Sequence, residues 1–320
     1  MQNFEFFTPT KILFGKGAVA DLPTEIKRYT NRVLLTYGGG SVKRLGIYDT
    51  VTNLLKQNGI EYIELSGIEP NPKVESVELG AKLCRENNLG GVLALGGGST
   101  IDCSKVIAGA VGYNGNAWDI VLNPDKIKSV LPIFTVLTLS ATGSEMNGNA
   151  VISNMQSNDK KGVYHIDFKP KCSVLDPEYT FSVSPWQTAS GTADIMSHIF
   201  ETYFNKTKGT MVQDNIAEGL LKVCIENGKK AFDNPTDYTA RANLMWASSL
   251  AINGLTGMGK SGAWSCHAME HQLSAYYDIT HGAGLATLTP AWFEYVLNDD
   301  TYATYFNDDG TAKDSLDPMG

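Results

Sequence analysis

The sequence predicts a Rossmann-like α/β domain at the amino-terminal end, followed by an all-α domain. Short, continuously apolar runs alternate with helical patterns over residues 1–180, which is typical of parallel strands that are covered on both faces. Beyond that point β-branched runs become rare, and one helical pattern follows another. A chain of 320 residues is long enough for two such domains. We therefore expect the α/β domain over 1–180 and the helical domain over 181–320.

Apolar runs predict four strands of the first domain. They cover 32–37, 60–65, 91–95 and 132–137. The first and third runs each lead into the sequence Gly-Gly-Gly-Ser, at 38–41 and 96–99, and a helical pattern follows each turn. Backbone N–H groups point outward at such a turn, and the helix dipole favours an anion there. The two turns therefore indicate a phosphate or dinucleotide site, with an ordinary tight turn as the alternative.

Five helical patterns make up the second domain. Ser184 and Pro185 open this region, because Ser is a good helix cap and Pro fits the first helical position. The patterns cover 193–204, 211–230, 237–252, 263–276 and 283–297. The last segment, 298–320, is polar and acidic and predicts no packed element. We therefore expect the helical domain to be incomplete, as in a truncated product.

Composition excludes several classes of protein. The net charge is −8 and there is no long basic run, which argues against binding to nucleic acid. No run of about 18 apolar residues exists, so the sequence predicts no membrane span. The five cysteines are scattered without a CxxC pair, which argues against a Cys/His zinc module and for reduced thiols. A cytoplasmic location is therefore expected.

The histidines give the strongest sign of chemistry. The chain has five, and three of them fall within 267–281. Asp194 and His198 have the i, i+4 spacing that puts both side chains on one face of a helix, and His267 and His271 repeat that spacing. His281 follows shortly after. Imidazoles together with a carboxylate suit Fe²⁺ or Zn²⁺, whereas ordinary buried histidines are the alternative.

These segments together resemble the iron-containing (group III) alcohol dehydrogenases, especially their NADPH-dependent butanol dehydrogenase branch. The resemblance covers about residues 5–297, and the motifs occur in the family's order. Its motifs are the segments 9–17, 96–105, 141–145, 175–177, 191–194, His198, 265–271 and 281–282. The resemblance implies a two-domain fold similar to that of dehydroquinate synthase, with the cofactor on the α/β domain and a metal on the helical domain.

The resemblance also implies roles for particular residues. The family's metal ligands fall on Asp194, His198, His267 and His281. His271 matches a histidine near the nicotinamide that is not a ligand, and it is the candidate catalytic residue for proton relay. The candidate cofactor-binding residues are Gly39, Ser41, Gly97, Gly98, Ser99, Asp102, Thr138, Thr142 and Lys161.

The expected function is hydride transfer between NAD(P)H and a small aldehyde or primary alcohol, such as butanal or butanol. NADP(H) is expected in preference to NAD(H), because no acidic residue stands at 38–44 and Lys43 or Arg44 can add positive charge. A homodimer is the family's usual state. Two alternatives stand beside this function: a lyase of the dehydroquinate synthase-like fold, and a truncated remnant without catalytic activity.

Overall fold

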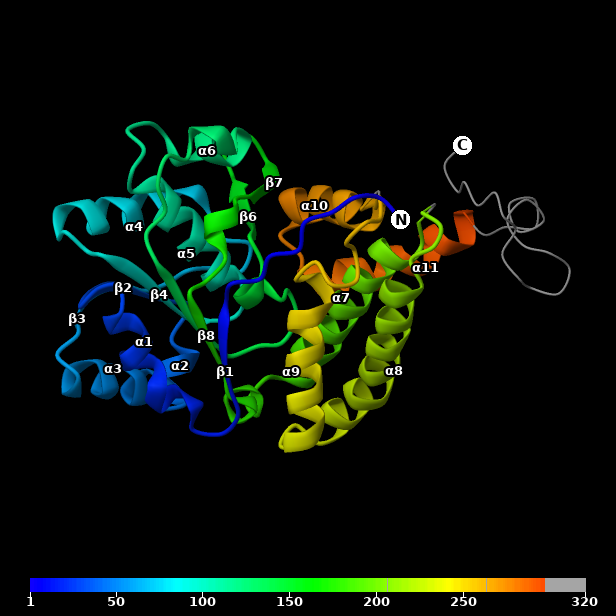
Figure 1. Cartoon of the computed structure of the whole chain (residues 1–320), viewed down its shortest axis with the longest axis horizontal. Coiled ribbons are helices and arrows are strands. Elements are labelled where there is room, and N and C mark those ends of the chain that lie inside the picture. The colour runs from blue at the N-terminus through cyan, green and yellow to red at the C-terminus, as the bar shows by residue number, and fades with distance from the viewer. Residues whose placement is uncertain (206, 263, 297–320) are drawn as a thin grey trace, which may run out of the picture.

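Six parallel strands form the central sheet, in the order β1-β8-β5-β4-β2-β3 (Figure 1). The computed structural model describes residues 1–205, 207–262 and 264–296. The strands are β1 (Lys11–Phe14), β2 (Arg32–Tyr37), β3 (Glu61–Leu65), β4 (Gly91–Gly96), β5 (Ile133–Leu137) and β8 (Cys172–Leu175). The four predicted strands are among them. The two that the sequence did not predict, β1 and β8, have only four residues each, too few to show a clear pattern.

Helices cover both faces of this sheet (Figure 1). One face carries α4 (Val74–Glu86), α5 (Gly98–Ala110) and α6 (Ala117–Leu122), and the other carries α1 (Leu22–Lys27), α2 (Ser41–Arg44) and α3 (Ile47–Gln57). Successive side chains of a strand point to opposite faces. On β2, Leu34 therefore packs in the first core, while Val33 and Leu35 pack in the second. Two-sided burial is why the strands read as continuous apolar runs.

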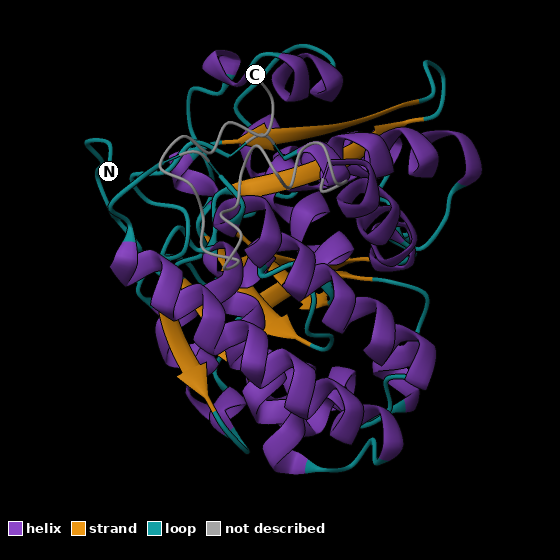
Figure 2. Cartoon of the chain, turned by 90° about the vertical axis from the view of Figure 1, so that its right-hand side faces the viewer, coloured by secondary structure: helices purple, strands orange, loops and turns teal. Residues whose placement is uncertain are grey.

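A separate antiparallel hairpin, β6 (Asn149–Asn154) and β7 (Asp159–Tyr164), lies apart from the main sheet (Figures 1 and 2). The sequence analysis missed it, because its strands are rich in Asn, Asp, Ser and Lys. Only alternate residues are apolar and buried: Ala150 and Ile152 on β6, and Val163 on β7. These three pack against the core above the sheet. The opposite side of the hairpin carries a mixture of polar and apolar residues, among them Asn149, Val151 and Lys160.

Helices make up the rest of the described chain, and they stack beside the sheet (Figure 2). They are α7 (Pro185–Tyr203), α8 (Met211–Asp233), α9 (Tyr238–Ile252), α10 (Ser265–Tyr277) and α11 (His281–Val296). The first begins at Pro185, as the helix start at Ser184 and Pro185 predicted, and it continues without a break through 193–203. The hydroxyl of Ser184 accepts a hydrogen bond from the N–H of Gln187 at 3.2 Å. The predicted fold class is confirmed. The segment 298–320, predicted to lack a packed element, lies outside the described residues.

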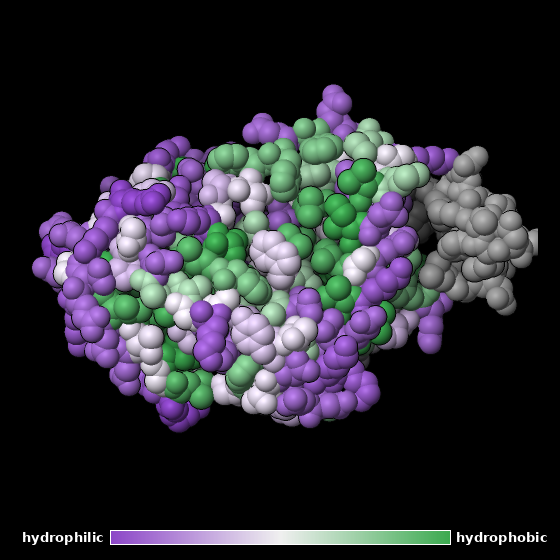
Figure 3. All heavy atoms as spheres, turned by 60° about the horizontal axis from the view of Figure 1, so that its bottom comes forward, coloured by the Kyte–Doolittle hydropathy of each residue, from purple (hydrophilic) through white to green (hydrophobic). Residues whose placement is uncertain are grey.

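The amino-terminal segment crosses from the sheet to the helices (Figure 1). The amino group of Met1 donates to the carbonyl of Lys208 at 2.6 Å, and the N–H of Gln2 donates to Gly259 at 2.9 Å. Figure 3 shows one face of the molecule, on which hydrophobic and hydrophilic residues are mixed. Among the described helices, none combines the length and the apolar character needed to cross a membrane.

Candidate active site and metal centre

A cavity of about 500 Å³ lies between the α/β part and the helices. Its walls come from both halves of the described chain. The α/β half contributes the start of α5, the loop after β5 and the β6–β7 hairpin, and the helical half contributes α7, α10 and the start of α11. Residues that carry chemistry in its wall are Ser99, Asp102, Thr142, Ser144, Lys160, His198, His267, His271 and His281.

Both glycine turns stand at the same edge of the sheet. β2 and β4 are neighbours and parallel, so 38–41 and 96–99 follow adjacent strand ends. The side on which successive strands join the sheet changes between β2 and β4. β3 lies on the outer side of β2, whereas β5 lies on the other side, beyond β4. Such a switch point forms a crevice in which dinucleotides bind. The turns thus have the geometry that the phosphate prediction requires.

The second turn is packed closely at Gly98, where a side chain does not fit. A Cβ on Gly98 would lie 2.3 Å from Oγ1 of Thr142. Gly97 caps α5, and Ser99 lines the cavity. The N–H of Thr138 donates to the carbonyl of Gly96 at 3.1 Å, which holds the loop after β5 beside the turn. The first N–H groups of α5, which lack partners within the helix, therefore belong to a segment that borders the cavity through Ser99.

Asp102 has a structural part as well as a place in the cavity wall. Its carboxylate accepts hydrogen bonds from the hydroxyl of Ser144 at 2.5 Å and from the N–H of Val151 at 2.9 Å. Burial raises its pKa more than the charge of Lys105 and these hydrogen bonds lower it. Lys105 is wholly buried and donates to Ser144 at 2.8 Å. The network ties the hairpin to α5.

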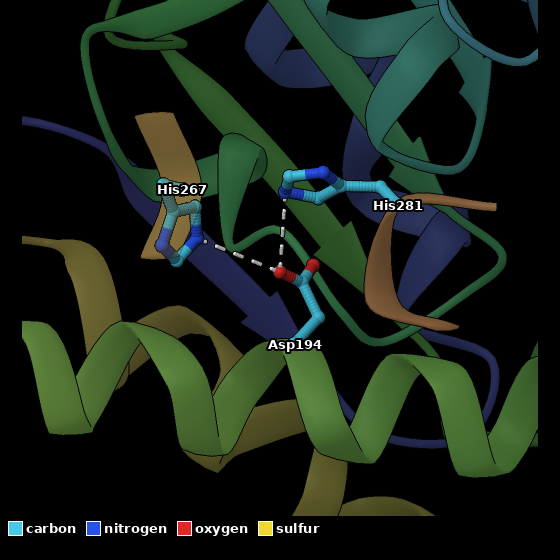
Figure 4. Close-up of side chains that lie close together, drawn as sticks. All are labelled: Asp194, His267 and His281. Carbon is cyan, nitrogen blue, oxygen red and sulfur yellow. Dashed lines mark ion pairs between the residues drawn. The ribbon is translucent and has the colours of Figure 1, made fainter. Parts of the chain in front are cut away.

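Three imidazoles lie close to one carboxylate oxygen, Oδ1 of Asp194, and Figure 4 draws two of them, those of His267 and His281. Nε2 of His198 and Nε2 of His281 each lie 3.6 Å from Oδ1 of Asp194, and Nε2 of His267 lies 3.9 Å from it. Asp194 and His198 stand one turn apart on α7, His267 is in the first turn of α10, and His281 begins α11. Figure 4 shows the carboxylate of Asp194 pointing from its helix to a place between His267 and His281.

Asp194, His267 and His281 fit a divalent metal ion, because each offers a ligand atom and these atoms lie within 4.8 Å of one another. His198 stands beside them and is the fourth candidate ligand. Oδ1 of Asp194 and Nε2 of His267 are buried and have no hydrogen-bond partner within the described chain. Unpartnered buried polar atoms are costly, and an ion between them would remove that cost. Burial lowers the pKa of His198 to about 3, so its ring is neutral at pH 7, as a metal ligand must be. Three imidazole nitrogens and a carboxylate suit Zn²⁺ or Fe²⁺.

The convergence depends on a close contact between two helices. A Cβ on Gly282 would lie 2.0 Å from the carbonyl oxygen of Ser190, so only glycine fits at this position of α11. This contact holds the start of α11 against α7. His281, the residue before Gly282, is thereby placed beside Asp194.

Two glutamates that the sequence analysis missed orient the imidazoles. Oε1 of Glu201 accepts the backbone N–H of His267 at 2.9 Å and lies 3.2 Å from its Nδ1. Oε2 of Glu270 likewise contacts Nδ1 of His281. Carboxylates on the far nitrogen fix the ring and leave Nε2 for the metal. The spacing held a signal for Glu201, because it follows Asp194 and His198 on the same face of α7.

The structure corrects the prediction for Lys161. Its side chain is 45% exposed and pairs with Asp159, whereas Lys160 is 4% exposed and lines the cavity. Neighbouring residues of a strand point to opposite faces, so only one of the two lysines can face the cavity. Lys160 places its Nζ 3.3 Å from Oε2 of Glu270 and 3.4 Å from Nδ1 of His281. Its pKa is lowered by burial, against the opposing effect of Glu270.

His271 lines the cavity but is not among the residues whose ligand atoms gather around Asp194. Its ring centroid lies 5.6 Å from that of His281. Burial and the positive charge of Lys160 lower its pKa to about 3. Donor atoms of Glu270, His271 and His281 also lie within 4.8 Å of one another. The carboxylate of Glu270 is already engaged by Lys160, Ser274 and His281, so the group around Asp194 is the better metal site.

Comparison with known proteins identifies the family. The model of the iron-containing alcohol dehydrogenases matches residues 9–177, and the model of the family's carboxyl-terminal part matches residues 188–309. NADH-dependent butanol dehydrogenase A of Clostridium acetobutylicum is 62% identical over 94% of this chain and 77% of its own length. NADPH-dependent aldehyde reductase YqhD of Escherichia coli is 45% identical over 92% of this chain and 76% of its own length.

A solved structure supports the same family assignment. The crystal structure of NADH-dependent butanol dehydrogenase A from Thermotoga maritima superposes with a TM-score of 0.91 at 42% identity. The match covers 95% of this chain and 77% of that one. The chain therefore belongs to the iron-containing alcohol dehydrogenase family and is an oxidoreductase, an alcohol dehydrogenase.

Proposed function

We propose that this enzyme transfers hydride between NAD(P)H and a small aldehyde or primary alcohol, at a divalent metal held by Asp194, His198, His267 and His281. The carrying observation is the convergence of three Nε2 atoms on Oδ1 of Asp194, in the wall of a cavity that Ser99 and Thr142 also line. The names of the butanol dehydrogenase relatives support butanal and butanol as substrates. Fe²⁺ and Zn²⁺ both suit the ligand set.

The metal, when bound, would supply Lewis-acid polarisation of the carbonyl oxygen. The residues of the chain bind and orient the reactants around it. Gly97, Gly98 and Ser99 are proposed to bind the pyrophosphate through backbone N–H groups. Asp102, Thr138 and Thr142 are proposed to position the ribose and nicotinamide. Lys160 takes the role first expected of Lys161, because it is the lysine that faces the cavity.

His271 is proposed to pass a proton between solvent and the substrate oxygen as a neutral imidazole, accepting a proton at one ring nitrogen and releasing one from the other, since its pKa is lowered to about 3. Its ring lies in the cavity wall beside His281, within reach of a substrate bound at the metal site. Trp264 also lines the wall, with its ring 5.1 Å from that of His267, and helps to exclude water from the reacting atoms. The residues of the chain thus position the reactants, exclude water from them and provide a path for the proton.

The preference for NADPH over NADH, predicted from the first glycine turn, stays a prediction. Space supports it, because a Cβ built on Gly39 meets nothing within 4 Å and a 2′-phosphate would have room beside Ser41. The positive charge of Lys43 supports the NADPH preference less, because Lys43 pairs with Glu64. Relatives of both kinds exist by name, NADH-dependent at 62% identity and NADPH-dependent at 45%.

Two further expectations also stay predictions, the homodimer and the cytoplasmic location. Light scattering of the purified chain measures the mass of the assembly and tests the homodimer directly. Expression of a tagged chain followed by cell fractionation tests the location.

The proposed function is tested by following the absorbance of NADPH and NADH with butanal, alongside metal analysis of the same sample. We expect oxidation of the nucleotide that depends on aldehyde and on about one metal ion per chain. Binding of nucleotide and metal without turnover would favour the remnant without activity. The lyase alternative requires a cluster of basic residues for a phosphorylated substrate; Lys160 is the lysine in the cavity wall, and its charge is paired with Glu270.

A further inference from the structure

Four side chains form a cluster where β2 ends, and we call them the Lys43 cluster: Tyr37, Lys43, Tyr48 and Glu64. The hydroxyl groups of Tyr37 and Tyr48 each donate to one oxygen of Glu64, at 2.5 Å. Nζ of Lys43 lies 3.5 Å from Oε2 of the same carboxylate. It also stands over both rings, 4.9 Å from the centroid of Tyr37 and 4.4 Å from that of Tyr48.

This arrangement holds the ammonium group by several contacts at once. A cation over an aromatic face is attracted by the ring, and here two rings and one carboxylate act on the same group. Burial raises the pKa of Glu64, but the hydrogen bonds from Tyr37 and Tyr48 and the charge of Lys43 together lower it below its ordinary value. Glu64 is therefore ionised at neutral pH. The side chain of Lys43 is 48% exposed, so it is held in place without being buried.

The cluster stands next to the first glycine turn. Tyr37 is the last residue of β2, and Lys43 lies on α2, which begins directly after Gly40. Glu64 lies opposite Leu35 in the register of β2 and β3. In a dinucleotide site at the switch point, the adenosine ribose lies at the end of the strand next to the pyrophosphate turn. The cluster therefore borders the place where a 2′-hydroxyl or 2′-phosphate would lie.

We propose that Glu64 shifts the nucleotide preference of this enzyme away from NADPH by holding Lys43 and by adding a negative charge beside the 2′-position. This inference rests on the proposed function, because it needs the adenosine ribose at the end of β2. A free cation favours a 2′-phosphate, and Lys43 is the lysine nearest to the turn in sequence. While Glu64 pairs with Lys43, the positive charge of Lys43 is offset. The same carboxylate also repels the phosphate.

The test replaces Glu64 by Gln, which keeps the shape and one hydrogen-bond acceptor but removes the charge. The dissociation constants of NADPH and NADH are measured by quenching of tryptophan fluorescence, without aldehyde. We expect the affinity ratio to move toward NADPH by about three- to fivefold, as for the loss of one partly exposed ion pair. NADH binding should change little. The shift should shrink as ionic strength rises, because salt screens exposed charges.

Two controls make the result specific. Glu61→Gln removes the same charge from the same strand, at a residue that pairs with Arg32 instead of Lys43. It should leave the ratio unchanged. In a Lys43→Met background, Glu64→Gln should lose most of its effect. Thermal melting of each variant verifies that the chain is folded.

The outcomes separate the two proposals. An unchanged ratio in Glu64→Gln, an equal shift in Glu61→Gln, or a full effect without Lys43 would overturn the role of Glu64 while nucleotide binding itself stands. Binding of neither nucleotide by the unaltered chain would overturn the proposed function, and the inference with it. A shift that requires both Glu64 and Lys43 supports the inference.

Discussion

Nζ of Lys160 lies 3.3 Å from Oε2 of Glu270, and the two side chains are 4% and 0% exposed. Lys160 is on β7 and Glu270 is on α10, so the ion pair joins the hairpin to the helices across the cavity wall. The same carboxylate binds Nδ1 of His281. The pair therefore links a lysine of the proposed nucleotide site to the orientation of a proposed metal ligand.

Lys160→Met should weaken both stability and metal binding. Removal of Lys160 leaves the buried negative charge of Glu270 without its ion-pair partner. We therefore expect a loss of about 3 kcal/mol in the free energy of unfolding. Loss of support for a metal-bound imidazole costs about tenfold in metal affinity. Urea unfolding and metal titration measure the two effects. Lys161→Met is the matched control and should change stability by no more than about 0.5 kcal/mol, because that lysine is half-exposed. A larger effect at Lys161 would contradict the placement of the two lysines.

His267→Ala should abolish metal binding, and chelation of the unaltered enzyme should abolish turnover. The imidazole of His267 is one of the three that converge on Asp194, and three remaining ligands bind a divalent ion much more weakly. His271→Ala should keep about one metal per chain and lower the rate, because His271 is not among the residues whose ligand atoms gather around Asp194. Elemental analysis of the two purified variants distinguishes them. Retention of metal in the first, or its loss in the second, would show that the roles of His267 and His271 are exchanged.

Gly98→Ala should impair nucleotide binding and stability together. The new Cβ would lie 2.3 Å from Oγ1 of Thr142, whose position is fixed by a hydrogen bond from the N–H of Ser144 at 3.2 Å. Overpacking of this kind costs about 1–3 kcal/mol. Gly219→Ala is the control: that glycine lies on α8 with open space around it, and the change should stabilise the chain by about 0.4–1 kcal/mol. Thermal melting and NADPH titration of both variants measure the difference, and equal behaviour would contradict the close packing at Gly98.

Gly39→Asp should reduce the use of NADPH more than the use of NADH. A carboxylate at the end of β2 accepts hydrogen bonds from a 2′-hydroxyl and repels a 2′-phosphate. The position is open, since a Cβ there meets nothing within 4 Å, so the fold should tolerate the change. The ratio of kcat/KM for the two nucleotides with butanal gives the answer, and the unaltered enzyme is expected to prefer NADPH. A variant that keeps its use of NADPH would show that the adenosine ribose lies elsewhere.

Much of the fold followed from patterns along the chain. The run at 91–95 and the residues 33–35 of the run at 32–37 are apolar because their strands are buried on both faces, and this pattern marks a parallel sheet without further information. The β6–β7 hairpin escaped prediction, because the side that lines the cavity mixes polar and apolar residues and so breaks the pattern of a strand. A strand that lines a binding site therefore lacks the continuous apolar sequence of a strand that is buried in a core.

The sequence by itself determined the chemistry available to this protein, and the tertiary structure decided which residues share a site. The i, i+4 spacing of Asp194 and His198 places them on one helix face whatever the rest of the chain does. Their convergence with His267 and His281 depends on the contact of Gly282 with Ser190, which joins segments far apart in the sequence. The choice between Lys160 and Lys161 likewise depends on which face of β7 meets the cavity. Local spacing is set by backbone geometry, whereas long-range contacts are set by packing, and packing involves the whole chain.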